Sequence, residues 1–159
     1  MGERAEGLAK TFEAKAGELS GVIEKLSDAD WKKVTSAEKW PVGVTAHHVA
    51  SAHEPIAGIV KTVASGQTVP PFTMGQLDEA NAKHAKDFVG CTKAETLALH
   101  KKGAADAAKM VRGLSDAELD KSGTVLTGMS PMSVQQIIEG VLINHVQEHM
   151  DSIRNTVGR

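Results

Sequence analysis

Apolar residues recur at intervals of three and four along most of the chain, and this spacing constrains the fold more than any other feature. It places apolar side chains on one face of an α-helix, and β-branched interruptions are few. An all-α fold is therefore expected. The predicted helical segments are residues 3–26, a short piece around Trp31, about 41–65, about 76–113 and 133–156.

Proline, glycine and capping residues set the expected ends of these helices. Pro41 is tolerated in a first turn, where its missing N–H costs nothing. Residues 66–72 contain two prolines and are expected to form the long loop. Gly90 predicts a break or bend within the third helical segment. Ser133 begins a capping box, and the Gly-, Ser- and Thr-rich stretch of residues 122–132 predicts a small hairpin or irregular connector before the last helix.

Two similar pentapeptides follow the first and third helical segments. Residues 26–30 are Leu-Ser-Asp-Ala-Asp, and residues 114–118 are Leu-Ser-Asp-Ala-Glu. Each leads through a connector containing proline into a helix that carries histidine. If the echo is a half-repeat, two helical hairpins pack into a four-helix bundle with the histidine-bearing helices in equivalent places.

Length and composition exclude several classes of function. The 159 residues, 41% of them apolar, suit one domain spanning residues 1–159. A net charge of −2 and 3% aromatic residues argue against a nucleic-acid binder. No apolar run approaches the roughly 20 residues that span a bilayer, and the first residues are charged and lack the apolar stretch of a signal peptide, so neither element is expected. The single cysteine, Cys91, excludes an internal disulfide, so a cytoplasmic protein without nucleic-acid or membrane partners is expected.

Seven histidines among so few aromatic residues are the unusual part of the composition. His145 and His149 stand four residues apart, one above the other on a helix face, as two ligands of one metal require. Both lie along or within the apolar stripe of the last helix. The metal-free alternative is a pair of core or boundary histidines that are satisfied by hydrogen bonds.

A metal site needs a third protein ligand, which the second long helix offers. Each residue turns an α-helix by about 100°, so His48 lies about 45° around the helix axis from the centre of the apolar stripe. His53 lies roughly twice as far from the stripe, and His47 falls on the polar side. His48 is therefore the internal candidate, whereas His47 and His53 are expected to face solvent or an interface.

The remaining candidates have weaker support. His84 and His100 lie in polar stretches and are expected at the surface. Cys91 resembles a small buried hydrophobe more than a ligand. His145-x-x-Glu148-His149 matches the inverted zincin pattern, but only ten residues follow for a further acidic ligand. Glu148 is therefore interpreted as a solvated residue or a partner of a ligand.

The order and spacing of these motifs resemble the DinB-like superfamily. Residues 40–49, Trp-Pro-Val-Gly-Val-Thr-Ala-His-His-Val, are similar to its second-helix signature, in which a metal-binding histidine follows a tryptophan by eight residues. The closing H-x-x-x-H and Asn81 are also similar. The resemblance covers nearly the whole chain. It implies a four-helix bundle that holds a divalent ion, usually zinc or nickel, through His48, His145 and His149.

The resemblance also implies a range of reactions. Family members with assigned activities include thiol-dependent transferases and isomerases, which implies a low-molecular-weight thiol as a further cofactor. Arg154 is the nearest candidate for a substrate-binding arginine. A three-histidine ion with an open position would activate either a thiol or a water molecule, so a thiol transferase, an isomerase or a hydrolase of a small molecule is expected. Catalytic residues beyond the ligands are not identified.

Two non-catalytic functions compete with the enzyme hypothesis. The bundle cavity could hold a metal or a small apolar ligand without turnover. The chain could also be a structural bundle that acts as a homodimer, because helices rich in alanine and glycine permit close helix–helix approach. A homodimer is expected under any of these functions.

Overall fold

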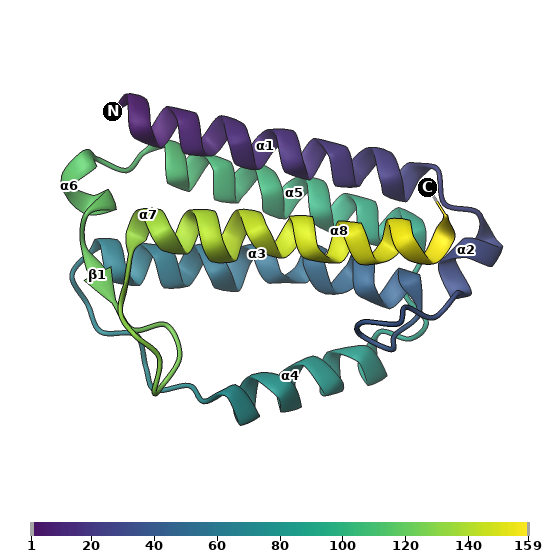
Figure 1. Ribbon diagram of the computed structural model, residues 1–159. Helices are drawn as coiled ribbons and strands as arrows, with labels where there is room; N and C mark the ends of the chain where they lie inside the picture. Colours follow the sequence, from purple (N-terminus) through teal and green to yellow (C-terminus); the bar gives the residue numbers. More distant parts are fainter. Residues whose placement is uncertain (1, 159) are drawn as a thin grey trace.

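The computed structural model describes residues 2–158 and shows four long helical rods side by side (Figure 1). The rods are α1, α3, α5 and the continuous run of α7, η1 and α8, so the predicted all-α four-helix bundle is confirmed. In chain order the elements are α1 (Glu3–Glu24), α2 (Asp28–Lys32), α3 (Val42–Ala64), α4 (Met74–Asp87), α5 (Lys93–Arg112), α6 (Asp116–Leu119), β1 (Ser122–Gly123), β2 (Met132–Ser133), α7 (Val134–Ile137), the π-helical segment η1 (Ile138–Ile143) and α8 (Asn144–Val157).

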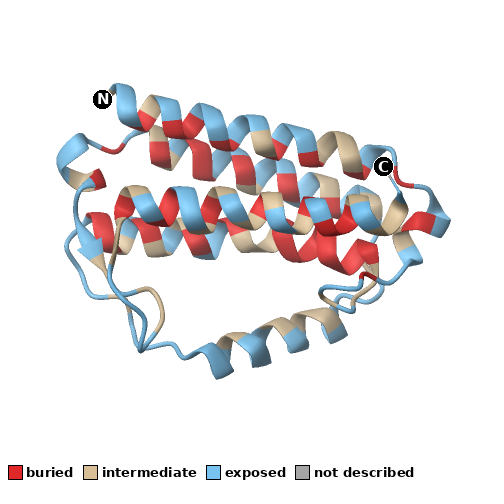
Figure 2. Cartoon of the chain, viewed as in Figure 1, coloured by how far each residue is buried: buried red, intermediate tan, exposed pale blue. Residues whose placement is uncertain are grey.

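The core lies between the four rods, where the apolar stripes meet (Figure 2). Phe12 of α1 and Met150 of α8 are fully buried, and the small side chains of α5 let this helix approach α1 and α3 closely. Outside the core the rods carry charged side chains. No helix within residues 2–158 combines the length and apolar character needed to cross a membrane.

The predicted helix starts and the predicted hairpin are confirmed. Ser27, Ser115 and Ser133 each form a capping box with the residue three positions on, so both halves of the sequence echo begin short helices in the same way. β1 pairs with β2 in an antiparallel register, Ser122 opposite Ser133. The hairpin thus closes directly onto the first turn of the last rod.

The break or bend predicted at Gly90 is confirmed, because residues 88–92 divide the third helical segment into α4 and α5. α5 belongs to the bundle, whereas α4 lies outside it and has no buried residue. The loop before α4 is tied to residues 124–132 by two hydrogen bonds: Thr127 N donates to Phe72 O (2.9 Å), and Phe72 N donates to Thr127 Oγ1 (3.1 Å). The sequence indicated the break at Gly90 but not that α4 would lie outside the bundle.

The last rod contains a π-helical segment that the sequence analysis did not predict. The buried residues Ile138, Leu142, Val146 and Met150 are spaced by four along the sequence. In a regular α-helix each such step would rotate the stripe by about 40° away from the core. The wider turn of η1, where Asn144 N donates to Glu139 O, absorbs this drift. The first turn of α8 therefore keeps the same face toward the bundle.

Gly43 in the first turn of α3 permits a close contact that anchors α2 to the bundle. A Cβ atom at this position would lie 2.2 Å from Cε2 of Trp31. The indole Nε1 of Trp31 donates to Cys91 O (3.0 Å), so the ring is also fixed from the other side. The missing side chain of Gly43 is therefore part of the packing of α2, α3 and the turn before α5.

The Gly43→Ala substitution should destabilise the protein by about 1–3 kcal/mol, because the added methyl group overlaps a ring that cannot move freely. Gly58→Ala is the matched control on the same helix, because Gly58 is exposed and has open space around its Cα. The control should stabilise α3 by up to about 1 kcal/mol. Urea unfolding of the metal-free proteins would measure both, and equal effects of the two substitutions would contradict the packing role of Gly43.

Candidate metal centre

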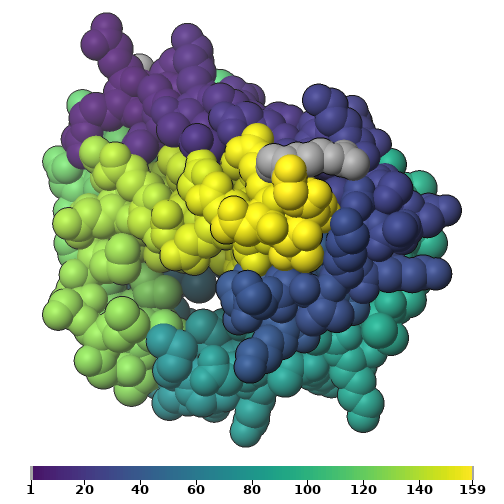
Figure 3. Space-filling model, turned by 45° about the vertical axis from the view of Figure 1, so that its right-hand side comes forward, coloured from purple at the N-terminus to yellow at the C-terminus, as the bar shows by residue number. Residues whose placement is uncertain are grey.

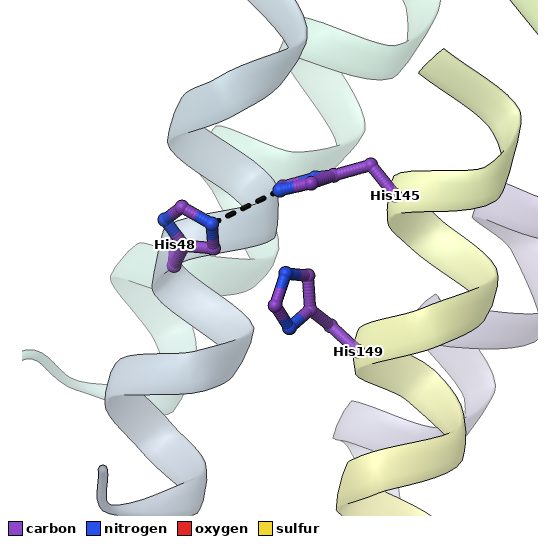
Figure 4. A group of neighbouring side chains, drawn as sticks. All are labelled: His48, His145 and His149. Carbon is purple, nitrogen blue, oxygen red and sulfur yellow. Dashed lines mark hydrogen bonds between the residues drawn. The ribbon is translucent and has the colours of Figure 1, made fainter. Parts of the chain in front are cut away.

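Three histidines from two rods meet between α3 and α8 (Figure 4). His48 comes from α3, and His145 and His149 stand one turn apart on α8. Each offers a ring nitrogen, and these three atoms lie within 4.8 Å of one another. Nε2 of His48 is 2.9 Å from Nε2 of His145. In the described part of the chain this is the one group of three or more such side chains close enough to share a metal ion.

The electrostatics of this site keep two of the three rings, His48 and His145, neutral. Burial, and then the neighbouring histidines, lower the pKa of His48 to about 3. Burial and His149 lower the pKa of His145 to about 3 in the same way. A neutral imidazole has a free lone pair, which is the form that binds a metal. The rings of His48 and His145 are therefore in the protonation state that a metal ligand requires at neutral pH.

The donor set fits a divalent transition ion. Zinc–nitrogen bonds of about 2.0–2.1 Å at a tetrahedral angle put two nitrogen ligands about 3.3 Å apart, close to the spacing of His48 and His145. Imidazole suits zinc and nickel alike. Three protein ligands leave one position of a tetrahedral ion open, as in catalytic rather than structural sites.

Glu38 contacts the third histidine and was missed by the sequence analysis. Its Oε2 lies 3.1 Å from Nδ1 of His149, and its Oε1 accepts a hydrogen bond from the hydroxyl of Ser152 (2.6 Å). Burial alone would raise the pKa of Glu38, but hydrogen bonds from Ser152, His149 and neighbouring groups hold it below its ordinary value. Glu38 lies in a loop without periodicity, so the sequence contains no signal for this contact.

His47 and His84 form a second pair beside the centre, and both predictions for them are wrong. His47, expected at the surface or an interface, is buried, and its Nδ1 lies 2.8 Å from Nε2 of His84 on α4. His84, expected at the surface, is half-buried, and its ring centroid lies 5.7 Å from that of His48. Phe88 stacks on His47 at 4.2 Å. Every residue from Val42 to Ala50 is buried, so this part of α3 has no solvent-exposed face.

The side of the bundle next to α4 is open. α4 runs below α3 in Figure 1, and the space-filling view shows a hollow between α4 and α8 (Figure 3). α3, α8 and α4 carry His48, His145 and His84, respectively. The helices that enclose this region are therefore the ones that carry the clustered histidines.

His53 and His100 form a third pair inside the core, and the expectation that they lie at the surface or an interface is wrong. Each is only 1% exposed. His100 Nε2 donates to Ala16 O (2.8 Å), which leaves its Nδ1 to accept from Nε2 of His53 (2.9 Å). The edge of the Phe12 ring packs against His53. The pair links α1, α3 and α5, so His53 is a core residue rather than a ligand.

The other candidates lie apart from the three clustered histidines. Cys91 is half-buried, its Sγ donates to Gly43 O (3.4 Å), and burial raises the pKa of its thiol. Glu148 is exposed and accepts a hydrogen bond from Asn144, in keeping with its interpretation as a solvated residue. Arg154 lies 4.0 Å from Glu18 of α1. Within residues 2–158, none of these side chains forms a hydrogen bond or ion pair with His48, His145 or His149.

Comparison with known proteins gives one family and one fold. The family model described as the DinB superfamily matches residues 11–153. YfiT from Bacillus subtilis, described as a probable metal-dependent hydrolase with an unusual four-helix bundle topology, is similar with a TM-score of 0.81 and 18% identity. The match covers 100% of this chain and 89% of YfiT. No curated protein sequence matches the chain.

A second solved protein is similar over a smaller share of its length. Mycothiol-dependent maleylpyruvate isomerase matches with a TM-score of 0.74 and 13% identity, covering 94% of this chain and 60% of that chain. A mutant of the same isomerase matches with a TM-score of 0.75 and 12% identity over the same shares. At these identities the likeness concerns the fold.

The buried His53–His100 pair should make the metal-free protein less stable as the pH falls. Burial and His100 lower the pKa of His53 to about 3, whereas an unfolded histidine titrates near 6.5. Between these values the unfolded state binds more protons, so the free energy of unfolding falls by up to about 1.4 kcal/mol per pH unit for each such ring. Urea unfolding at a series of pH values measures this slope.

The His53→Leu/His100→Leu double variant tests whether this pair contributes to the slope. The double variant removes both rings, and Ala16 O still accepts a hydrogen bond from the hydroxyl of Ser20 (3.1 Å). Replacing both partners by apolar groups of similar size should cost little at neutral pH. The variant should lose less stability on acidification than the wild type, and parallel pH profiles would refute the assignment.

The His48→Ala, His145→Ala and His149→Ala variants should each lose bound metal by about tenfold or more, because each removes one of three ligands. Elemental analysis of protein purified without a histidine tag measures the metal per chain. His47→Ala is the matched control, since it removes a buried ring at the adjacent position of α3, and it should keep its metal. Metal retained by the three variants, or lost equally from the control, would contradict the ligand set.

Proposed function

The chain belongs to the DinB superfamily, and from its three clustered histidines we propose that it is a metal-dependent enzyme that acts on a small molecule. The observation that carries the proposal is the convergence of ring nitrogens of His48, His145 and His149 within 4.8 Å, beside an open side of the bundle. The likeness to YfiT, which is described as a probable metal-dependent hydrolase, supports the same class of function.

Each residue around the site has a distinct part in this proposal. His48, His145 and His149 hold a divalent ion, zinc or nickel, through ring nitrogens. Such an ion supplies Lewis-acid activation of a water molecule or of a small thiol at the position that the three ligands leave open. The edge of the Trp40 ring packs against His48, with 5.2 Å between the centroids, and limits the rotation of that ligand. The hollow between α4 and α8 provides room for a substrate (Figure 3).

Two reactions are compatible with this arrangement. Activated water would make the protein a hydrolase, and an activated thiol would make it a transferase or isomerase. The likeness to mycothiol-dependent maleylpyruvate isomerase supports the thiol reaction, whereas YfiT supports hydrolysis. In both cases His48, His145 and His149 would hold the ion, and the ion would lower the pKa of a bound water molecule or thiol so that it could act as a nucleophile.

Reconstituted protein should separate these reactions. The wild type would be stripped of metal, reloaded with zinc or nickel, and assayed on activated esters without thiol and on electrophilic alkenes and arenes with a small thiol. We expect turnover in one of the two assays. The rate should fall by about 100-fold or more in His48→Ala, because this variant no longer binds the metal ion that acts as the Lewis acid. His47→Ala, which keeps the three ligands, is the control.

The outcomes of this experiment are distinct. Ester cleavage that needs no thiol assigns the hydrolase, and conjugation that needs thiol assigns the transferase. A protein that binds about one ion per chain but turns over nothing in either panel would contradict the proposal and favour a metal- or ligand-binding bundle. A wild type that binds neither zinc nor nickel would overturn the metal centre itself.

A further inference from the structure

We propose that Glu38 is a positioning residue of the metal centre, which fixes the ring of His149 and thereby sets the affinity for the ion. The inference rests on the proposed function, since it concerns the ion that His48, His145 and His149 would hold. Glu38 itself lies outside the three-histidine group. It acts through His149, to which its Oε2 lies within 3.1 Å.

The contact fixes which nitrogen of His149 is free. A carboxylate accepts hydrogen bonds, so Nδ1 of His149 carries a proton and donates a hydrogen bond to Glu38. The lone pair is then on Nε2, the nitrogen at the other side of the ring. Metal-binding histidines commonly donate their second ring N–H to a carboxylate in this way, which fixes the tautomer and raises the basicity of the ligand.

Glu38 is itself held in place. Its Oε1 accepts from the hydroxyl of Ser152, which lies on α8 three residues after His149. The Glu38 side chain is 11% exposed and that of His149 is 15% exposed, so water competes little for the contact. One carboxylate thus spans two positions of the same helix, and the ring of His149 is fixed relative to the axis of α8.

The loop that carries Glu38 has little conformational freedom. Thr35 N donates to Trp40 O (2.9 Å), and Val42 N donates to Lys33 O (2.7 Å), so the two arms of the loop are tied together. Lys39 has φ of 64°, in the left-handed region that is unfavourable for a residue with a side chain. Strained residues of this kind persist where the surrounding contacts hold them, often at functional sites.

The same loop contacts a second ligand. Trp40, two residues after Glu38, packs the edge of its ring against His48. Residues 33–41 therefore contact one ligand from α3 and one from α8, although the loop provides no ligand itself. This geometry separates the two tasks of the site: the helices supply the nitrogens, and the loop orients the rings.

Chelator competition measures the consequence directly. Zinc dissociation constants would be determined for the wild type, Glu38→Ala and Glu38→Gln with a chromophoric chelator. We expect Glu38→Ala to bind zinc about 10–100-fold more weakly, the range found when partners of metal ligands are removed. Glu38→Gln should recover part of this loss, because its amide oxygen still accepts the Nδ1 proton although it lacks the charge.

Glu148→Ala is the matched control. Glu148 is the residue next to His149 on α8, but its carboxylate is exposed and accepts from Asn144 instead. Removing this charge should leave the zinc affinity within about twofold of the wild type, because an exposed charge is screened by solvent. The absorption spectrum of the cobalt-loaded proteins should show the same coordination number in the wild type and both Glu38 variants, as expected for a residue that is not a ligand.

Urea unfolding of the metal-free proteins shows whether each variant is folded, so a loss of zinc affinity can be distinguished from a loss of fold. Glu38→Ala should remain folded without metal, so a weaker affinity in a folded variant reports on the site. Equal zinc affinity in Glu38→Ala and wild type would overturn the inference while leaving the proposed function intact. A cobalt spectrum that changes coordination number in Glu38→Gln would also overturn it, because Glu38 would then be a ligand. Absence of zinc binding by the wild type would instead overturn the proposed function.

Discussion

The burial of neutral imidazole rings is the constraint on which the rest of the structure depends. A buried polar ring costs free energy unless it is hydrogen-bonded, and all seven histidines of this chain have a partner from another element. His48 faces His145, His47 faces His84, His53 faces His100, and His149 faces Glu38. These contacts link α3 to α8, α4 and α5, and α8 to the loop before α3. The arrangement of the helices is therefore tied to the pairing of the rings.

The pairs differ in what surrounds them, and this difference separates structure from chemistry. His53 and His100 are enclosed between α1, α3 and α5, and their chain of hydrogen bonds ends on the backbone carbonyl of Ala16. His48, His145 and His149 instead bring three ring nitrogens to one point, next to the hollow between α4 and α8 (Figure 3). A closed chain of donors and acceptors stabilises the core, whereas converging lone pairs suit a metal ion.

Much of the fold and part of the site could be predicted from local patterns. The spacing of apolar residues predicted the bundle, and the capping box predicted at Ser133 was confirmed. The wheel of α3 selected His48 because this ring lies nearest the apolar stripe. It failed for His53 because this ring pairs with His100 of α5 away from the stripe, and for His47 because a wheel assumes one buried face. The first half of α3 is instead buried on every side, by α2, α4, α5 and the last rod.

The sequence by itself determined the helical periodicity, the caps, and the i, i+4 pair of His145 and His149, because each depends on residues within one or two turns. The spacing of four from Ile138 to Met150 also contained a signal for the π-helical segment, which a regular helix cannot accommodate without turning its stripe. Only the tertiary structure decided which rings face one another and that Glu38 reaches His149, 111 residues away along the chain. Contacts of this kind join segments whose relative placement is set by the packing of whole helices, and no local pattern encodes that placement.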